Sequence, residues 1–122
     1  MKKIQDIYKS LGEYGCLLIC YLNEACVKAD IVKHFNELVE LDIIDNDCYV
    51  LDGDRLLKFF GSDKRIVRGI NENGNTIVPY KYRNAEHFVV VNERKEIVFN
   101  SLENSTCVRL GEPVWDEARY LA

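Results

Sequence analysis

The sequence predicts an α+β fold in which N-terminal helices pack on an antiparallel β-sheet. Apolar residues recur at helical spacing through the first half of the chain, up to about Phe60. From Arg65 onward, apolar runs of strand length are separated by turn signals. Helices that precede the strands, rather than alternating with them, are typical of this fold class.

The composition is that of one globular domain with a modest negative charge. The chain has 122 residues, 48% of them hydrophobic, and a formal net charge of −4. It contains no basic run, so we expect neither nucleic acid nor an anionic membrane as a partner. The polar start of the chain does not resemble a signal peptide, and no apolar segment approaches the roughly 18 residues of a membrane span.

Five cysteines bear on the cellular compartment, and they stand at positions 16, 20, 26, 48 and 107. An odd number without an export signal argues against a disulfide framework. We therefore expect reduced thiols and a cytoplasmic protein.

Two glycines divide the first helical region. Residues 2–11 are amphipathic, with Ile4 and Ile7 among the apolar positions at helical spacing. Gly12 and Gly15 are expected to end this stretch and to turn the chain. The helix that follows Gly15 is apolar almost all round, as expected for the central helix of a core.

Two further helices are expected before the strands. Residues 28–41 carry an apolar stripe at helical spacing. Residues 55–60 form a shorter helix, which Asp52 or Asp54 can cap and which Gly61 can end.

The first two strands are expected to form a hairpin. Residues 65–70 and 76–82 flank Asn73-Gly74, a dipeptide typical of tight hairpin turns. Pro79 lies inside the second segment, which predicts an edge strand or an interrupted one.

Three more segments complete the predicted sheet. Residues 87–91 and 96–100 are strands joined by the polar turn 92–95. A last short strand is expected near 106–110, and the apolar groups of the tail 115–121 are expected to pack on the domain.

Cys16 is the first candidate for chemistry, because it follows Gly15 and opens the apolar helix. The unpaired N–H groups and the dipole at a helix N-terminus favour a negative charge. A thiol there can have a lowered pKa and act as a nucleophile. The alternative is a small buried apolar residue, which is how Cys20 and Cys26 are interpreted.

His87 is the second candidate, because it begins the most apolar predicted strand, where packing does not require a histidine. Its side chain is expected to share a face with Val89 and Val91, which would hold the imidazole toward the helix carrying Cys16. The alternative is a histidine at the exposed end of a strand. The other histidine, His34, is interpreted as a packing or boundary residue of its helix.

Asn100 is the third candidate, because it closes the strand that follows His87. If Val91 pairs with Glu96 or its neighbour Ile97, Asn100 or the next residue lies opposite His87. An acceptor at that position can orient an imidazole. The alternative is an ordinary asparagine at a strand end.

No metal or cofactor is expected. Cys16 and Cys20 lie four residues apart, but no second Cys/His pair follows at ligand spacing. The acidic residues between positions 42 and 54 do not match the spacing of a helix–loop–helix calcium site, and they are interpreted as caps and turns. The sequence has no phosphate-binding loop and no dinucleotide-binding glycine pattern.

The order Cys16, His87, Asn100 resembles the papain-like cysteine peptidase superfamily. The pieces that carry the likeness are Tyr14-Gly15-Cys16 before the apolar helix, the strand 87–91, and the segment 97–102. They are most similar to peptidase domains that clip double-glycine leader peptides and to small relatives in phages and bacteria. The resemblance implies one papain-like domain over residues 1–122, with Cys16 as nucleophile, His87 as general base and Asn100 as the residue that orients it.

One position departs from the pattern of that family. Such peptidases usually carry a glutamine about six residues before the cysteine, where its side chain donates to the oxyanion, and here that position is Ser10. An oxyanion donor is worth about 3–4 kcal/mol of transition-state stabilisation. Ser10, Tyr14 and Tyr8 are the candidates to replace it, alongside the backbone N–H of Cys16.

Two functions of different classes follow. The first is a cysteine peptidase or amidase that acts on a peptide or amide bond. The alternative is a catalytically inactive papain-like scaffold that binds another protein, such as a phage or mobile-element accessory module. The missing glutamine, the small size and the acidic charge favour this alternative. A third interpretation is a globular domain in which the three residues occur by coincidence.

Overall fold

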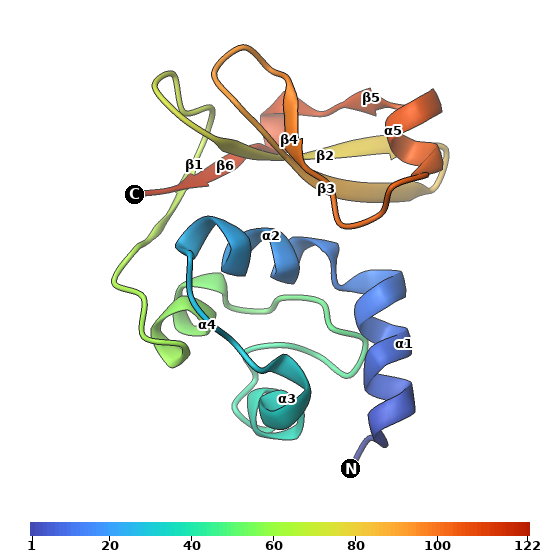
Figure 1. The fold of residues 1–122 in the computed structure, drawn as a ribbon, viewed down its shortest axis with the longest axis vertical. Helices are drawn as coiled ribbons and strands as arrows, with labels where there is room; N and C mark the ends of the chain where they lie inside the picture. The colour runs from blue at the N-terminus through green and yellow to red at the C-terminus, as the bar shows by residue number, and fades with distance from the viewer. The chain divides into compact units, whose positions relative to one another are not determined.

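The computed structural model describes residues 1–122, and the chain divides into two compact units, Met1–Arg65 and Ile66–Ala122 (Figure 1). The first unit contains the helices α1 to α4, and the second contains the β-sheet together with α5. Helices that precede an antiparallel sheet confirm the predicted α+β class.

The first two helices meet at Gly15, where Figure 1 shows a sharp bend. α1 spans Ile4–Tyr14 and α2 spans Cys16–Ala25. The prediction that Gly12 ends the first helix is wrong, because α1 continues through it; an interior glycine weakens a helix by only about 1 kcal/mol. At Gly15 the chain does turn, and a Cβ there would lie 2.6 Å from the Leu11 carbonyl oxygen. Only glycine fits this turn without displacing the end of α1.

The next two helices begin at aspartate caps. α3 spans Ile31–Glu40, later than predicted, because the Asp30 carboxylate accepts a hydrogen bond from the Lys33 backbone N–H at 3.0 Å. α4 spans Gly53–Phe59, and its cap is Asp52, which accepts from the Arg55 N–H at 3.1 Å.

The helices of the first unit pack on one another through their apolar faces. α2 contacts α1 and α4, and α1 also contacts α3. Fully buried side chains of these four helices include Ile7, Leu18, Phe35, Leu38, Leu56 and Leu57. None of the helices combines the length and the apolar character that crossing a membrane requires.

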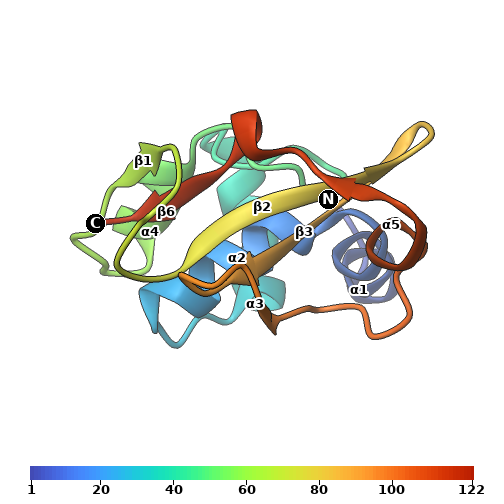
Figure 2. The ribbon, with the colours of Figure 1, turned by 90° about the horizontal axis from the view of Figure 1, so that it is seen from above.

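The second unit is built on an antiparallel sheet with the strand order β1-β6-β2-β3-β4. The strands are β1 (Ile66–Arg68), β2 (Thr76–Tyr82), β3 (Ala85–Val91), β4 (Ile97–Phe99) and β6 (Arg119–Leu121), and the two-residue β5 (Glu112–Pro113) pairs with β2. Figure 2 shows β2 and β3 as the long central pair, with β1 beside β6.

The predicted hairpin between the first two strands is wrong, because β6 lies between them. Ile66 pairs with Leu121 on one side of β6, and Ile77 pairs with Arg119 on the other. β1 ends at Arg68, and the next residue, Gly69, has a φ of 122° that redirects the chain. The loop that follows is therefore longer than a two-residue turn and leaves room for a strand from the tail.

Pro79 lies inside a continuous central strand, so the prediction of an edge or interrupted strand is also wrong. Its carbonyl oxygen accepts from the Val114 N–H at 2.9 Å, on the side of β2 that faces away from β3. The amide and the carbonyl of one strand residue point to the same side, so the missing N–H removes no bond of the β2–β3 ladder.

The segments 87–91 and 96–100 pair as predicted. The Asn92 N–H donates to the Glu96 carbonyl at 2.9 Å and closes the turn, and Val91 pairs with Ile97. A register shift between Val90 and Val91 then places Val90 opposite Phe99.

The prediction of a last strand near 106–110 is wrong, because these residues form the helix α5 (Thr106–Leu110). The Ser105 side chain accepts from the Val108 N–H at 3.4 Å and caps this helix, which outweighs the strand preference of threonine and valine. After α5 the tail forms β5, the short 3-10 helix η1 (Trp115–Glu117) and β6.

One buried cluster of the second unit lies on one face of its sheet. Val78, Val89, Val91 and Ala118 form a buried cluster. The partly buried side chains packed against it are Tyr80, Val108 and Trp115.

Candidate functional site

Cys16 is the first residue of α2, and its side chain is partly exposed. The Gly15 before it provides no side-chain cap, and no acidic residue occupies the first turn of α2. Gly15 therefore supplies no capping oxygen to the first backbone N–H groups of this helix. A negative charge at the start of α2 is stabilised by these groups and by the helix dipole.

The other thiols differ from Cys16 in burial. None of the five cysteines forms a disulfide. Burial raises the pKa of the Cys20 thiol, and it raises the pKa of Cys48 to about 11. Cys107 is also buried, whereas Cys26 is exposed in a left-handed conformation after the last residue of α2. Cys26 is therefore the accessible thiol with which the reactivity of Cys16 is compared.

His87 lies inside β3, which begins at Ala85, and it pairs with Tyr80 of β2. Only 6% of the residue is exposed, so the interpretation of a histidine at an exposed strand end does not hold. Alternation along the strand places its side chain on the face of Val89 and Val91. His87 Nε2 lies 2.6 Å from Asn100 Oδ1, so the structure brings these two candidate residues together.

The amide oxygen of Asn100 receives a second hydrogen bond, from the backbone N–H of Leu102 at 3.0 Å. A backbone N–H can only donate, so the Asn100 atom that faces it must be the oxygen. The same oxygen faces His87, which assigns the hydrogen of the neutral imidazole to Nε2. The other ring nitrogen, Nδ1, is then the basic one.

The contact between His87 and Asn100 forms although the register differs from the simple pairing. Continued beyond Phe99, the shifted register places Asn100 at the level of Val89, two residues from His87 on the same face. Diagonal neighbours on one face of a sheet lie within reach of long side chains. The strand pairing ends at Phe99, which leaves Asn100 able to turn toward the imidazole.

The three candidate residues come from both parts of the chain. Cys16 belongs to the first unit, and His87 and Asn100 belong to the second. The candidate nucleophile and the His–Asn pair are thus each built by local structure: a helix start in one case and a β-hairpin in the other.

Two of the three candidates for an oxyanion donor, Ser10 and Tyr14, differ in their surroundings. Ser10 is buried on α1, and its hydroxyl oxygen accepts a hydrogen bond from Lys2 Nζ at 2.7 Å. Its own hydroxyl hydrogen can still be donated, since it is not used in that bond. Tyr14 ends α1 with 41% of the residue exposed, and its ring lies 5.4 Å from the ring of Tyr49.

Lys2, Tyr49 and Leu102 take part in these contacts, and none of them was recognised from the sequence. Lys2 binds Ser10 and the Asn46 carbonyl, which no local pattern near the start of the chain indicates. Leu102 could have been found, because asparagine often accepts from the backbone N–H two residues later.

His34 has a packing role, as predicted. Its ring lies 5.4 Å from that of Phe59 and 5.9 Å from that of Phe60. It also lies 3.6 Å from a carboxylate oxygen of Glu37 on the same helix.

Comparison with known proteins adds no relative. No protein-family model, curated protein or solved structure matches this chain. The chemistry of the site is therefore inferred from its own residues. No group of three or more His, Cys, Asp or Glu side chains is arranged to hold a metal ion.

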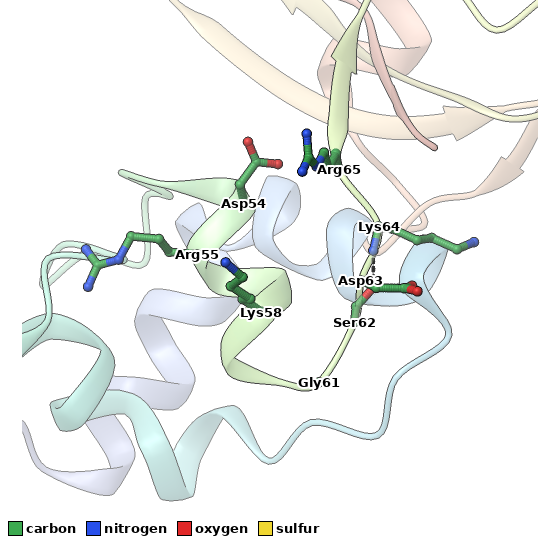
Figure 3. A pocket seen from close by; sticks show the side chains of 8 residues that line it. All are labelled: Asp54, Arg55, Lys58, Gly61, Ser62, Asp63, Lys64 and Arg65. Atoms are coloured by element: carbon green, nitrogen blue, oxygen red, sulfur yellow. Dashed lines mark hydrogen bonds between the residues drawn. The ribbon is translucent and has the colours of Figure 1, made fainter.

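A separate surface pocket of about 670 Å³ lies at α4 and the segment that follows it (Figure 3). Its lining residues are Asp54, Arg55, Lys58, Gly61, Ser62, Asp63, Lys64 and Arg65. Figure 3 shows Arg55 and Lys64 directed to opposite sides, so these two cations do not converge on one ligand. The pocket contains none of the candidate residues.

Proposed function

We propose that this protein is a cysteine peptidase or amidase of papain-like architecture, with Cys16 as nucleophile, His87 as general base and Asn100 as the residue that orients the imidazole. The observation that carries the proposal is the hydrogen bond between His87 Nε2 and Asn100 Oδ1 at 2.6 Å. It leaves Nδ1 as the basic nitrogen of an imidazole that is held in one orientation.

The chemistry divides into two steps. His87 Nδ1 takes the proton of the Cys16 thiol, and the thiolate sulfur attacks the carbonyl carbon of a peptide or amide bond. The C–N bond breaks, the imidazolium gives its proton to the leaving nitrogen, and a thioester remains on Cys16. Water, activated by His87, then attacks the thioester, releases the carboxylic acid and restores the thiol.

Each residue has a physical reason for its role. The start of α2 stabilises the thiolate through backbone N–H groups and the helix dipole. Asn100 is neutral, so it orients His87 without adding a negative charge next to the thiolate. The backbone N–H of Cys16, with Ser10 or Tyr14, is proposed to bind the oxyanion.

The experiment that tests this proposal is the rate of alkylation of Cys16 by iodoacetamide as a function of pH, in the parent protein and in His87→Ala. We expect fast labelling with an apparent pKa well below about 8.5, lost in His87→Ala. Cys26 provides the internal control, because it is exposed just after the C-terminal end of α2 and is not part of the proposed site.

Fragment mass spectra are needed to distinguish labelling of Cys16 from labelling of Cys26. Cys16, Cys20 and Cys26 lie between Lys9 and Lys28 and so share one tryptic peptide. Labelling of Cys16 with an ordinary thiol pKa, unchanged by removal of His87, would contradict a catalytic pair.

The alternative function is an inactive papain-like scaffold that binds a protein partner, and the environment of Ser10 favours it. Ser10 is 7% exposed and is engaged by Lys2 Nζ, so the position of the expected glutamine is committed to a contact within the first unit. In a scaffold of this kind Cys16 would react with the pH dependence of an ordinary thiol, and its reactivity would not depend on His87.

A further inference from the structure

Two tyrosine side chains lie in contact at the surface of the first unit. Tyr14 is 41% exposed and Tyr49 is 47% exposed, and their ring centroids lie 5.4 Å apart at an interplanar angle of 37°. Tyrosine rings combine apolar faces with a polar tip, which suits them to contacts with a ligand. A pair of rings gives such a ligand a larger surface than one tyrosine alone.

This pair lies next to the nucleophile. Tyr14 ends α1 and Cys16 begins α2, with only Gly15 between them. The pKa of the Tyr49 hydroxyl is raised by desolvation and by the nearby Tyr14, Asp47, Asp45 and Cys16. These groups are therefore close enough to Tyr49 to affect its ionisation.

The loop that carries Tyr49 is fixed by several contacts. The Asp45 carboxylate accepts from the N–H groups of Asp47 and Tyr49, at 2.8 and 3.0 Å, and the Asp45 N–H donates to the Tyr49 carbonyl at 3.0 Å. Cys48 is buried with a φ of 70°, and Ile44 and Val50 form a β-bridge around the loop. Tyr49 is thus presented on a constrained backbone.

The charges around this loop are mainly negative. Neither Asp45 nor Asp47 forms an ion pair. The nearby cation is Lys2, whose ammonium group already donates to Ser10 and to the Asn46 carbonyl. A positively charged group is attracted both by the carboxylates and by the faces of the tyrosine rings.

We infer that Tyr14 and Tyr49, together with Asp45 and Asp47, bind a lysine or arginine side chain of the peptide substrate beside the bond that Cys16 attacks. The inference rests on the proposed function and adds the substrate class. Glutamate at the same substrate position is disfavoured by the two aspartates.

Peptide chloromethyl ketones provide the test, because they alkylate an active-site thiol and carry a chosen side chain. Three matched series would place lysine, norleucine or glutamate at the first or the second residue before the ketone. Norleucine is the control for lysine, since it keeps the aliphatic stem and removes the charge. We expect Cys16 to react about tenfold faster with lysine than with norleucine at one of these positions, and slowest with glutamate.

Two variants test separately the contact with an aromatic ring and the contact with a negative charge. Tyr49→Ala and Asp47→Asn should each reduce the preference for lysine severalfold, where the preference is the ratio of the lysine and norleucine alkylation rates measured on the same variant. Tyr82→Ala and Asp63→Asn are the matched controls, because they remove a tyrosine and an exposed aspartate elsewhere in the chain. Neither control should change the preference.

The outcomes distinguish this inference from the proposed function. Alkylation of Cys16 that depends on His87 but is equal for lysine and norleucine would overturn the inference and leave the proposed function standing. Alkylation that is slow and independent of His87 would overturn both. A preference for lysine that survives in Tyr49→Ala and Asp47→Asn would show that another surface provides it, and would also overturn the inference.

Discussion

The backbone N–H of Leu102 donates to Asn100 Oδ1 at 3.0 Å, and this bond fixes the amide in the orientation that His87 requires. Because the oxygen is held in place, the hydrogen bond at 2.6 Å to the imidazole is made by the Nε2–H tautomer. The hairpin thus determines both the direction of the ring and the nitrogen that can act as a base.

The tautomer of His87 gives the first prediction. In nitrogen–proton correlation spectra, His87 of the parent protein should show the Nε2–H form when neutral. Asn100→Ala removes the acceptor, and the loss of about 1 kcal/mol should change the tautomer ratio about fivefold. His34 appears in the same spectra and should not change. A parent spectrum dominated by the Nδ1–H form would contradict the assignment.

The turn between α1 and α2 gives the second prediction, which uses two glycines as a matched pair. Gly15→Ala should lower the free energy of unfolding by about 1–3 kcal/mol, because its Cβ would lie 2.6 Å from the Leu11 carbonyl oxygen. Gly12→Ala should raise it by about 1 kcal/mol, because Gly12 is inside α1 and its Cβ would meet no atom within 4 Å.

Urea unfolding curves of the two glycine variants and the parent would measure both changes. Equal effects of the same sign would show that the close contact at Gly15 does not constrain the turn.

Buried cysteines give the third prediction, a loss of stability at alkaline pH. Burial raises the pKa of Cys48 from 9.0 to about 11, so between these values the unfolded chain loses a proton that the folded chain keeps. The unfolded state then binds fewer protons, and the free energy of unfolding falls as pH rises through this range. The contribution is on the order of 2 kcal/mol and is fully present below pH 9.

Comparison of Cys48→Ala with the parent isolates this contribution, since Cys20, lysines and tyrosines titrate in both proteins. The stability of the variant should fall less steeply between pH 9 and pH 11 than that of the parent. Parallel pH profiles would contradict a protonated Cys48 in the folded protein.

Local patterns predicted most of the fold. The helix after Gly15, the aspartate cap of α4 and the pairing of Val91 with Ile97 all depend on residues close together in the sequence. The insertion of β6 between β1 and β2 could not be predicted, because it depends on a distant tail segment. Strand propensity predicts a strand at residues 106–110, whereas the Ser105 cap makes them the helix α5.

Only part of the candidate site can be predicted from the sequence. The meeting of His87 with Asn100 follows from hairpin pairing, which the turn at 92–95 makes predictable. The bond of Lys2 to Ser10 and the contact of Tyr14 with Tyr49 join segments that no spacing rule connects. Contacts of this kind depend on how separate elements pack, so no local sequence pattern predicts them.

The most direct test of the central claim is a covalent cross-link between Cys16 and His87. 1,3-Dibromoacetone has two electrophilic carbons, each of which releases bromide when a thiol or an imidazole nitrogen attacks it. The reaction would use a Cys26→Ser background, because Cys26 is exposed and shares the tryptic peptide of Cys16. If the two residues act as a catalytic pair, mass spectrometry should find the Cys16 and His87 peptides joined, and the product should vanish in His87→Ala. Efficient single alkylation of Cys16 without any cross-link to His87 would contradict the account.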